Sequence, residues 1–258
     1  MSERNGARGT VAVVTGGSRG LGKNMVRRIA GRGTDVIFTY QSNSGAADEV
    51  VAELEGMGRR AVALQLDVGD AGTFDAFVDR VRGILRDWHT DRFQFLVNNA
   101  GVGVHAAIVD TTEEEFDLLM NVHVKGPFFL TQKLLPLMAD GGRIVNVSIG
   151  LTRFTLPGGQ GAYASAKGAV EVMTRYMALE LGPRRIAANT IAPGAIATDF
   201  SGGVVRDNPD VNKMVASDTA LGRAGLPEDI GGVVVALLSP EMGWVNAQRI
   251  EASGGQHL

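Results

Sequence analysis

A tyrosine and a lysine four residues apart are the side chains of this sequence that are best placed to do chemistry. Tyr163 and Lys167 belong to the run Tyr163-Ala-Ser-Ala-Lys167. On a helix, residues four apart lie on one face, about 6 Å apart along the axis. A phenol with an ordinary pKa of about 10 exchanges its proton poorly near neutrality, and a nearby ammonium lowers that pKa. The pair predicts acid/base chemistry on a carbonyl or alcohol, although a packed ring and a solvated amine share this spacing.

A glycine-rich turn follows a buried strand near the start of the chain. The run Thr10-Val-Ala-Val-Val-Thr15 leads directly into Gly16-Gly-Ser-Arg-Gly-Leu-Gly22. Glycines permit a tight turn and a close approach of the backbone to a phosphate, and the next helix presents free N–H groups and a positive dipole end. Strand, turn and amphipathic helix in this order predict a dinucleotide site.

With both regions considered, the chain resembles the short-chain dehydrogenase/reductase family from about residue 10 to the C-terminus. The matching segments occur in the family's order and at family-like intervals. They are Thr15-Gly16-x-x-x-Gly20-x-Gly22, Asp67-Val68, Asn98-Asn99-Ala100-Gly101, Ser148, Tyr163-x-x-x-Lys167, and Pro193-Gly194 followed by Ile196 and Thr198. The resemblance implies hydride transfer between a nicotinamide and a carbonyl carbon, in which the hydride chemistry belongs to the cofactor.

The resemblance also implies roles for the catalytic side chains. Ser148 is expected to hydrogen-bond the substrate oxygen, and Tyr163 to exchange a proton with it. Lys167 is expected to lower the pKa of Tyr163 and to bind the nicotinamide ribose.

One position departs from the family's pattern. A catalytic Asn commonly stands three residues before a Gly in the family, and here His123 precedes Gly126 by three residues, with Asn121 two residues earlier. A neutral imidazole both donates and accepts, so His123 can sustain a proton relay. The equally weighted alternative is a tolerated helix residue with a satisfied hydrogen bond.

Further cofactor contacts are implied by residue matches to the family. Asp67 and Val68 resemble the adenine contact, although Asp67 also suits a strand exit or helix cap. The whole expected set, with Tyr163 and Lys167, is Gly16, Ser18, Arg19, Gly20, Leu21, Gly22, Tyr40, Ser42, Asn43, Asp67, Val68, Asn98, Ala100, Gly101, Pro193, Gly194, Ile196 and Thr198.

The end of the second predicted strand indicates which dinucleotide binds. An NAD site usually places an Asp or Glu there, yet no carboxylate occurs between Asp35 and Asp48, and Asp35 begins the strand. Arg19 can place a cation beside a 2′-phosphate, while Ser42 and Asn43 supply donors. These features favour NADP(H) over NAD(H), with a merely exposed Arg19 as the alternative.

The elements that position these residues follow a repeating pattern. Short apolar, β-branched runs alternate with longer amphipathic runs, which is typical of parallel strands joined by crossover helices. Strands are predicted near 10–15, 35–40, 61–66, 93–98, 142–148, 186–191 and 247–251. Helices are predicted near 20–32, 44–57, 71–87, 113–138, 162–181 and 227–239, with a short one within 199–216. We expect an α/β fold of Rossmann type, a doubly wound parallel sheet of about seven strands with helices on both faces.

Composition agrees with a single dinucleotide-binding domain over residues 1–258. The chain is 45% apolar, carries a formal charge of −3 and has no cysteine. We therefore expect no nucleic-acid partner and no metal site. The polar residues 1–9 are expected to be flexible, and the absence of an apolar leader or membrane span predicts a cytoplasmic protein.

Substrate identity is only weakly indicated. Segment 195–224 is rich in glycine and small residues, and we expect it to form a substrate lid. Phe154, Leu156 and Phe200 favour a medium-sized ketone or aldehyde over a charged sugar. An NADP(H)-dependent carbonyl reductase is the leading hypothesis, with a 3-oxoacyl-thioester reductase and a non-catalytic dinucleotide sensor as alternatives. The resemblance also implies a homotetramer.

Overall fold

A computed structural model describes residues 9–258, and residues 1–8 of the expected flexible segment lie outside the described range. Seven strands form one sheet in the order β3-β2-β1-β4-β5-β6-β7, and every pairing is parallel. The strands are β1 (Val11–Val14), β2 (Asp35–Tyr40), β3 (Ala61–Gln65), β4 (Phe93–Asn98), β5 (Met138–Val147), β6 (Ala187–Pro193) and β7 (Arg249–Ala252). The chain reverses its direction of progress between β1 and β4, which is where doubly wound sheets bind ligands.

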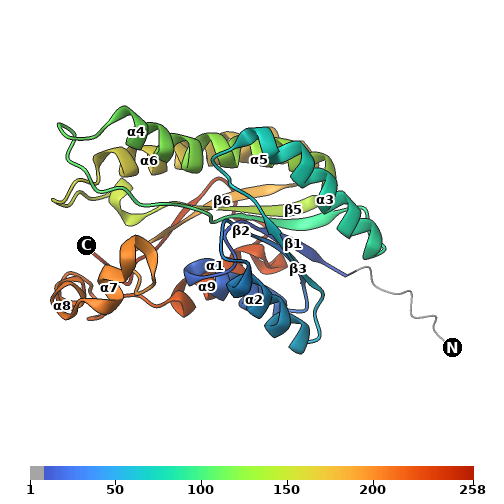
Figure 1. The fold of residues 1–258 in the computed structure, drawn as a ribbon, viewed down its shortest axis with the longest axis horizontal. Coiled ribbons are helices and arrows are strands. Elements are labelled where there is room, and N and C mark those ends of the chain that lie inside the picture. The colour runs from blue at the N-terminus through green and yellow to red at the C-terminus, as the bar shows by residue number, and fades with distance from the viewer. Residues whose placement is uncertain (1–8) are drawn as a thin grey trace.

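Helices cover both faces of the sheet, as Figure 1 shows. One face carries α1 (Gly20–Ala30), α2 (Ser44–Gly56) and α9 (Pro227–Leu238), and the other carries α3 (Phe74–Asp87), α4 (Glu113–Met120), α5 (Gly126–Leu134) and α6 (Gly161–Glu180). All four β1 residues are buried; Val11 and Val13 pack into one apolar cluster, Ala12 and Val14 into the other. Alternation along the strand therefore feeds two cores, and the predicted fold class is confirmed.

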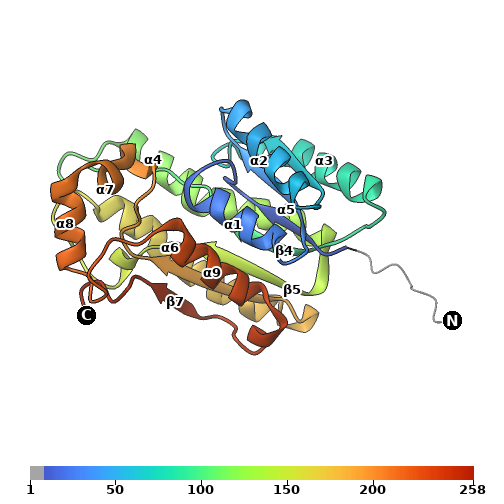
Figure 2. The ribbon, with the colours of Figure 1, turned by 90° about the horizontal axis from the view of Figure 1, so that it is seen from below.

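Two short helices extend the structure beyond the carboxyl ends of the strands. They are α7 (Val204–Asp207) and α8 (Pro209–Ser217), and Figure 2 shows them grouped at one end of the molecule, away from α2 and α3. None of the helices within residues 9–258 combines the length and apolar character that a membrane crossing requires.

The helix predicted over 113–138 is interrupted, which corrects the sequence prediction. Asn121–Lys125 forms a π-helical segment between α4 and α5, and Pro127 follows it in the first turn of α5. Proline has no N–H to donate to the residue four positions earlier, and its ring crowds that carbonyl, so an α-helical register cannot continue through it unchanged. The last residue of the predicted helix, Met138, instead opens β5.

Candidate active site

The carboxyl ends of four neighbouring strands bring the predicted segments to one edge of the sheet. The glycine turn follows β1, Asn98 ends β4, Ser148 follows β5, and Gly194 follows β6. Because β1, β4, β5 and β6 are adjacent and parallel, these segments share the edge at which ligands bind in open α/β sheets.

The backbone of the glycine turn fits a phosphate group. Gly16 and Gly20 have φ values of +69° and +52°, a conformation that favours glycine. A Cβ added to Gly22 would collide with the carbonyl oxygen of Gly16. Arg19 is the N-cap residue of α1, and its side chain makes no capping hydrogen bond, so no capping side chain occupies the first N–H groups of that helix. The turn therefore offers donors and space for a dinucleotide pyrophosphate.

Hydrogen bonds between the ends of β1 and β4 hold this turn in place. Asn99 makes most of them, and the sequence analysis assigned it no role. Asn99 donates from Nδ2 to the carbonyl oxygens of Thr15 and Gly16, at 2.9 and 3.0 Å. The N–H groups of Asn99 and Ala100 both donate to Thr15 Oγ1 at 3.0 Å. The sequence around Asn99 carries no signal of this role, because its partners lie more than 80 residues earlier in the chain.

The side chain of Asn98 is buried in the interior of the protein. Its Nδ2 donates to Asn146 Oδ1 at 2.7 Å and to Thr131 Oγ1 at 3.1 Å, and Asn146 in turn donates to Thr174. The amide N–H groups are thus paired inside the protein, which stabilises the packing of adjacent elements, whereas Asn98 Oδ1 is buried without a partner. The Asn98 side chain thus joins β4 and β5 to helices α5 and α6.

The predicted adenine end has local hydrogen bonds of its own. Asp67 accepts from the N–H of Gly69 at 2.8 Å and from Gln41 Nε2 at 3.3 Å, which is the turn geometry considered as an alternative. Asn43 caps α2 by accepting from the N–H of Ala46 at 3.0 Å. Ser42 is exposed beside this helix N-terminus. The hydroxyl of Ser42 is therefore open to solvent beside the capped N-terminus of α2.

The two charged residues relevant to cofactor choice are both paired. Asp35 begins β2, as predicted, and accepts from Arg60 Nε and Nη2 at 2.8 and 2.6 Å. Arg19 donates to Asp199 at 2.8 Å, with three quarters of its side chain exposed. An exposed pair of this kind contributes little stability, so Arg19 remains free to exchange its carboxylate partner for a phosphate.

Tyr163 and Lys167 lie on one buried face of α6, as their spacing predicts. Lys167 Nζ is 5.8 Å from the centroid of the Tyr163 ring and donates to the Val147 carbonyl at 2.8 Å. Burial raises the pKa of Tyr163 above its ordinary value and lowers the pKa of Lys167 to about 7. The direction for Tyr163 is opposite to the expected one, because burial disfavours the charged phenolate.

His123 packs directly against Tyr163 from the π-helical segment. The ring centroids are 5.2 Å apart in an edge-on arrangement, and His123 Nε2 is 2.7 Å from the Val102 carbonyl oxygen. A carbonyl only accepts, so Nε2 carries the proton and Nδ1 has only a lone pair to offer. That Nδ1 is buried without a partner, and burial, followed by the charge of Lys167, lowers the pKa of His123 to about 2. The imidazole is therefore neutral.

Ser148 has a placement different from the one that the resemblance implies. Its side chain is buried, and Oγ donates to Glu171 Oε1 at 2.7 Å, with the Lys167 carbonyl oxygen as a longer contact at 3.4 Å. Glu171 lies two helical turns after Tyr163, about 12 Å along the axis. The same carboxylate oxygen accepts from Thr152 Oγ1 at 2.7 Å and from Arg249 Nε at 2.8 Å. The structure thus directs the Ser148 hydroxyl to an ion-pair network.

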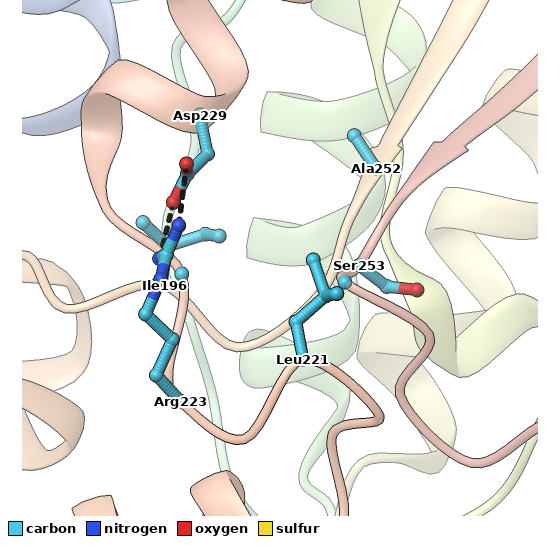
Figure 3. Close-up of a pocket in the computed structure, with 8 residues that line it drawn as sticks. Ile196, Leu221, Arg223, Asp229, Ala252 and Ser253 are labelled. Atoms are coloured by element: carbon cyan, nitrogen blue, oxygen red, sulfur yellow. Dashed lines mark hydrogen bonds and ion pairs between the residues drawn. The ribbon is translucent and has the colours of Figure 1, made fainter.

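Residues after β6 border a small cavity, which Figure 3 shows. Ile196 pairs with Gly225, and both line a cavity of about 140 Å³. The ion pair of Arg223 with Asp229, with contacts of 2.6 and 2.8 Å, closes one side of it. Tyr163 is not among the lining residues. The ion pair fixes the loop that supports Ile196 at the expected carboxamide position.

The predicted lid contacts the catalytic region. The ring of Phe200 lies 6.2 Å from that of Tyr163, and Ser201 Oγ is 3.1 Å from His105 Nε2. His105 Nδ1 is in turn 2.6 Å from Gln160 Nε2. Segment 195–224 therefore meets the loops after β4 and β5 over the tyrosine. Thr198, within this segment, is buried and accepts from the N–H of Phe200 at 3.2 Å.

Comparisons with known proteins agree with this geometry. A family model described as enoyl-(acyl carrier protein) reductase matches residues 16–257. The tetrahydroxynaphthalene reductase PfmaG of Pestalotiopsis fici is 35% identical over 257 residues, covering 96% of this chain and 91% of that protein. The solved structure of the reductase LugOII, which catalyses keto-reduction at C1 during lugdunomycin biosynthesis, has a TM-score of 0.91 at 38% identity and covers 97% of this chain and 98% of its own. The angucycline C-6 ketoreductase LanV with bound NADP has a TM-score of 0.90 at 35% identity, covering 96% of this chain and 95% of its own.

Proposed function

The chain belongs to the short-chain dehydrogenase/reductase family, and on this premise we propose that it reduces a ketone on an apolar ring system with NADPH. The observation that carries the proposal is the buried pair of Tyr163 and Lys167 under a cover that includes Phe200. Two of the similar proteins are named as ketoreducing enzymes, and a third as a hydroxynaphthalene reductase. An apolar cover and a single buried acid suit a flat, weakly polar ketone.

NADPH is the proposed reductant because the end of β2 lacks a carboxylate. Ser42 and Asn43 stand where a carboxylate would repel a 2′-phosphate, next to the positive N-terminus of α2. Arg19 adds an exposed guanidinium at the glycine turn. LanV, which is 35% identical to this chain, has a structure with bound NADP.

The proposed roles follow from the placement of each side chain. The cofactor, when bound, supplies the hydride. The glycine turn holds its pyrophosphate on backbone N–H groups, and Ile196 and Thr198 border its carboxamide. Tyr163 donates its proton to the carbonyl oxygen. Lys167 would orient the nicotinamide ribose, and its ammonium would favour release of the Tyr163 proton.

Two alternatives receive less support. A 3-oxoacyl carrier-protein reductase needs a basic patch at the site entrance to bind its acidic carrier, and the chain as a whole carries a formal charge of −3. A non-catalytic sensor does not require the buried Tyr163 and Lys167 pair. We therefore give the ketone reductase priority.

We also propose a cytoplasmic homotetramer. Large apolar side chains are exposed on α4, α5 and α6, among them Phe116, Phe128, Tyr176 and Leu179. Exposed apolar patches of this kind commonly mark protein interfaces. The mass in solution at micromolar concentration, measured by light scattering, tests this assembly, and a monomeric mass would contradict it.

The test of the activity is the loss of absorbance of NADPH, and separately of NADH, with cyclic aryl ketones, aliphatic ketones and 3-oxoacyl thioesters. We expect turnover with NADPH on the aryl ketones. Turnover confined to thioesters would replace the proposal with the carrier-protein alternative, and tight NADPH binding without turnover on any class would favour the sensor.

A further inference from the structure

The end of β5 turns two consecutive side chains to different sides. Ser148 Oγ donates to Glu171, whereas Ile149 packs against the buried cluster of Leu119, Tyr163 and Ala166. Ile149 has an extended backbone, with φ −151° and ψ 163°. Successive side chains on extended backbone point in opposite directions. The residue that the strand turns toward the tyrosine cluster is therefore aliphatic.

The two polar side chains that border the Tyr163 ring are both bonded to backbone carbonyls. His123 uses Nε2–H for the Val102 carbonyl, which leaves Nδ1 able only to accept. Lys167 Nζ donates to the Val147 carbonyl. Further apolar side chains pack against the same cluster, namely Val102, Val104, Met120, Val124 and Ala162. Tyr163 is thus the donor that this surface directs at a substrate oxygen.

A single donor is a sparse arrangement for carbonyl reduction. The oxygen gathers negative charge during hydride transfer, and each preorganised donor aimed at it contributes about 10²–10³ in rate. The polar side chains of the segment over the tyrosine, Ser201, His105 and Gln160, hydrogen-bond one another. With Ile149 on the side opposite to the Ser148 hydroxyl, a second donor has to come with the substrate. A hydroxyl held next to the carbonyl by a rigid ring supplies such a donor at no cost in orientation.

We propose that the preferred substrate is a cyclic aryl ketone with a hydroxyl group at the adjacent peri position, whose O–H hydrogen-bonds the reacting carbonyl oxygen, and that Ser148 is a positioning residue. This inference rests on the proposed function and names its substrate class. The carbonyl carbon takes the hydride and forms a C–H bond, while the C=O π pair moves to oxygen. That oxygen takes the Tyr163 proton, the peri hydroxyl keeps its own, and Tyr163 regains a proton from solvent.

Ser148 acts through the network that fixes the exit of β5. Glu171 Oε1 accepts from Ser148, Thr152 and Arg249, and Arg249 Nη2 also donates to the Ile149 carbonyl at 3.1 Å. These bonds anchor the backbone on both sides of the Ile149 side chain. Loss of the Ser148 hydroxyl is therefore expected to loosen this exit without removing a donor from the substrate.

A matched pair of substrates tests the proposal. The compounds 8-hydroxy-1-tetralone and 5-hydroxy-1-tetralone have the same formula, but only the first closes the intramolecular hydrogen bond. The ratio of their kcat/KM values with NADPH, divided by the ratio of their borohydride reduction rates, is expected to be about 10², mostly in kcat. A normalised ratio near one, with both compounds turned over, overturns this inference and leaves the proposed function intact. Turnover of neither compound with NADPH also overturns this inference, and the proposed function falls with it when no other cyclic aryl ketone is reduced.

Variants at the β5 exit separate the two residues. Ile149→Ser adds a hydroxyl on the Tyr163 side and is expected to raise kcat/KM for the 5-hydroxy compound, which would lower the normalised ratio of the two substrates at least tenfold. Ile149→Val reduces the side-chain volume without adding a donor and should leave that ratio unchanged. Ser148→Ala is expected to lower Tm and to keep the wild-type ratio, and Ser148→Thr to recover Tm. A tenfold or larger change of the ratio in Ser148→Ala would make Ser148 the donor and overturn its positioning role.

Discussion

The ring of His123 meets the ring of Tyr163 edge-on, with centroids 5.2 Å apart, while His123 Nε2 is held 2.7 Å from the Val102 carbonyl. This relationship fixes the tautomer of the imidazole. A proton relay through His123 would have to move a proton off Nε2, whose bond to Val102 opposes that step. The ring is therefore better suited to accept one hydrogen bond at Nδ1, from a water or from a ligand, than to pass a proton on.

His123 should make stability depend on pH in the acidic range. Burial lowers its pKa from 6.5 to about 2, so the folded state keeps it neutral while the unfolded state binds a proton below pH 6.5. The stability is fully present above 6.5 and falls as the pH decreases toward 2, at up to about 1.4 kcal/mol per pH unit for this group. Urea unfolding at pH 7 and pH 5 measures the loss, and His123→Asn should reduce it. An unchanged pH dependence in that variant would contradict the assignment.

Replacing Tyr163 by Phe should remove the proton donor and leave the ring in place. We expect a fall in kcat of about 10²–10⁴ with the affinity for NADPH nearly unchanged, because the packing against His123 and Phe200 uses the ring and not the hydroxyl. Stopped-flow turnover and fluorescence titration with NADPH measure the two quantities. Retained turnover would mean that another group donates the proton.

Lys167 should impose a limb on the pH profile near neutrality. Burial lowers its pKa to about 7, so the free enzyme loses the ammonium as the pH rises through 7. We expect kcat/KM for NADPH to decrease above that pH, by about tenfold per unit at the steepest. Lys167→Arg keeps its charge at all these pH values and should lack the limb, even at a lower rate. The same limb in the Arg variant would assign it to another group.

The strands could be predicted from the sequence because each is a short apolar run bounded by polar or glycine residues. β2 was predicted at 35–40 and is Asp35–Tyr40, since its central residues are buried on both faces. The interruption at Asn121–Lys125 could not be predicted from periodicity, because apolar residues continue through it. Pro127 was the only local signal, and a proline in the first turn of a helix is ordinary.

The direction of the Ser148 side chain could not be predicted either. A serine at the end of a strand carries the same motif signal on whichever side its hydroxyl points. Its partner Glu171 is 23 residues away and gives no sign in the sequence of accepting this bond. Asn99 was overlooked for the same reason, because its partners Thr15 and Gly16 are more than 80 residues earlier in the chain.

The ion-pair network at Glu171 should contribute measurably to stability. Arg249 contacts Glu171 at 2.8 Å and Glu251 at 2.9 Å, and the three side chains are 13–22% exposed. Arg249→Ala removes the guanidinium shared by two mostly buried carboxylates, leaving Glu171 only the hydroxyls of Ser148 and Thr152 and Glu251 its pair with Arg153. We therefore expect a loss of about 2 kcal/mol in the free energy of unfolding. Arg206→Ala, which removes an exposed pair with Asp207, is the control and should leave Tm unchanged. Equal effects in the two variants would show that burial does not decide the contribution.

Cofactor choice should respond to one charge at the end of β2. Ser42 follows this strand and is exposed next to the capped N-terminus of α2. Ser42→Asp introduces the carboxylate that an NAD site usually carries, which repels a 2′-phosphate and accepts from ribose hydroxyls. We expect kcat/KM for NADPH to fall at least tenfold while kcat/KM for NADH rises or stays constant. In Ser42→Asn, the asparagine has nearly the shape of the aspartate but no charge, so this control variant should keep the preference for NADPH. If both variants lower kcat/KM for both cofactors alike, Ser42 supports the backbone of the turn and does not face the phosphate.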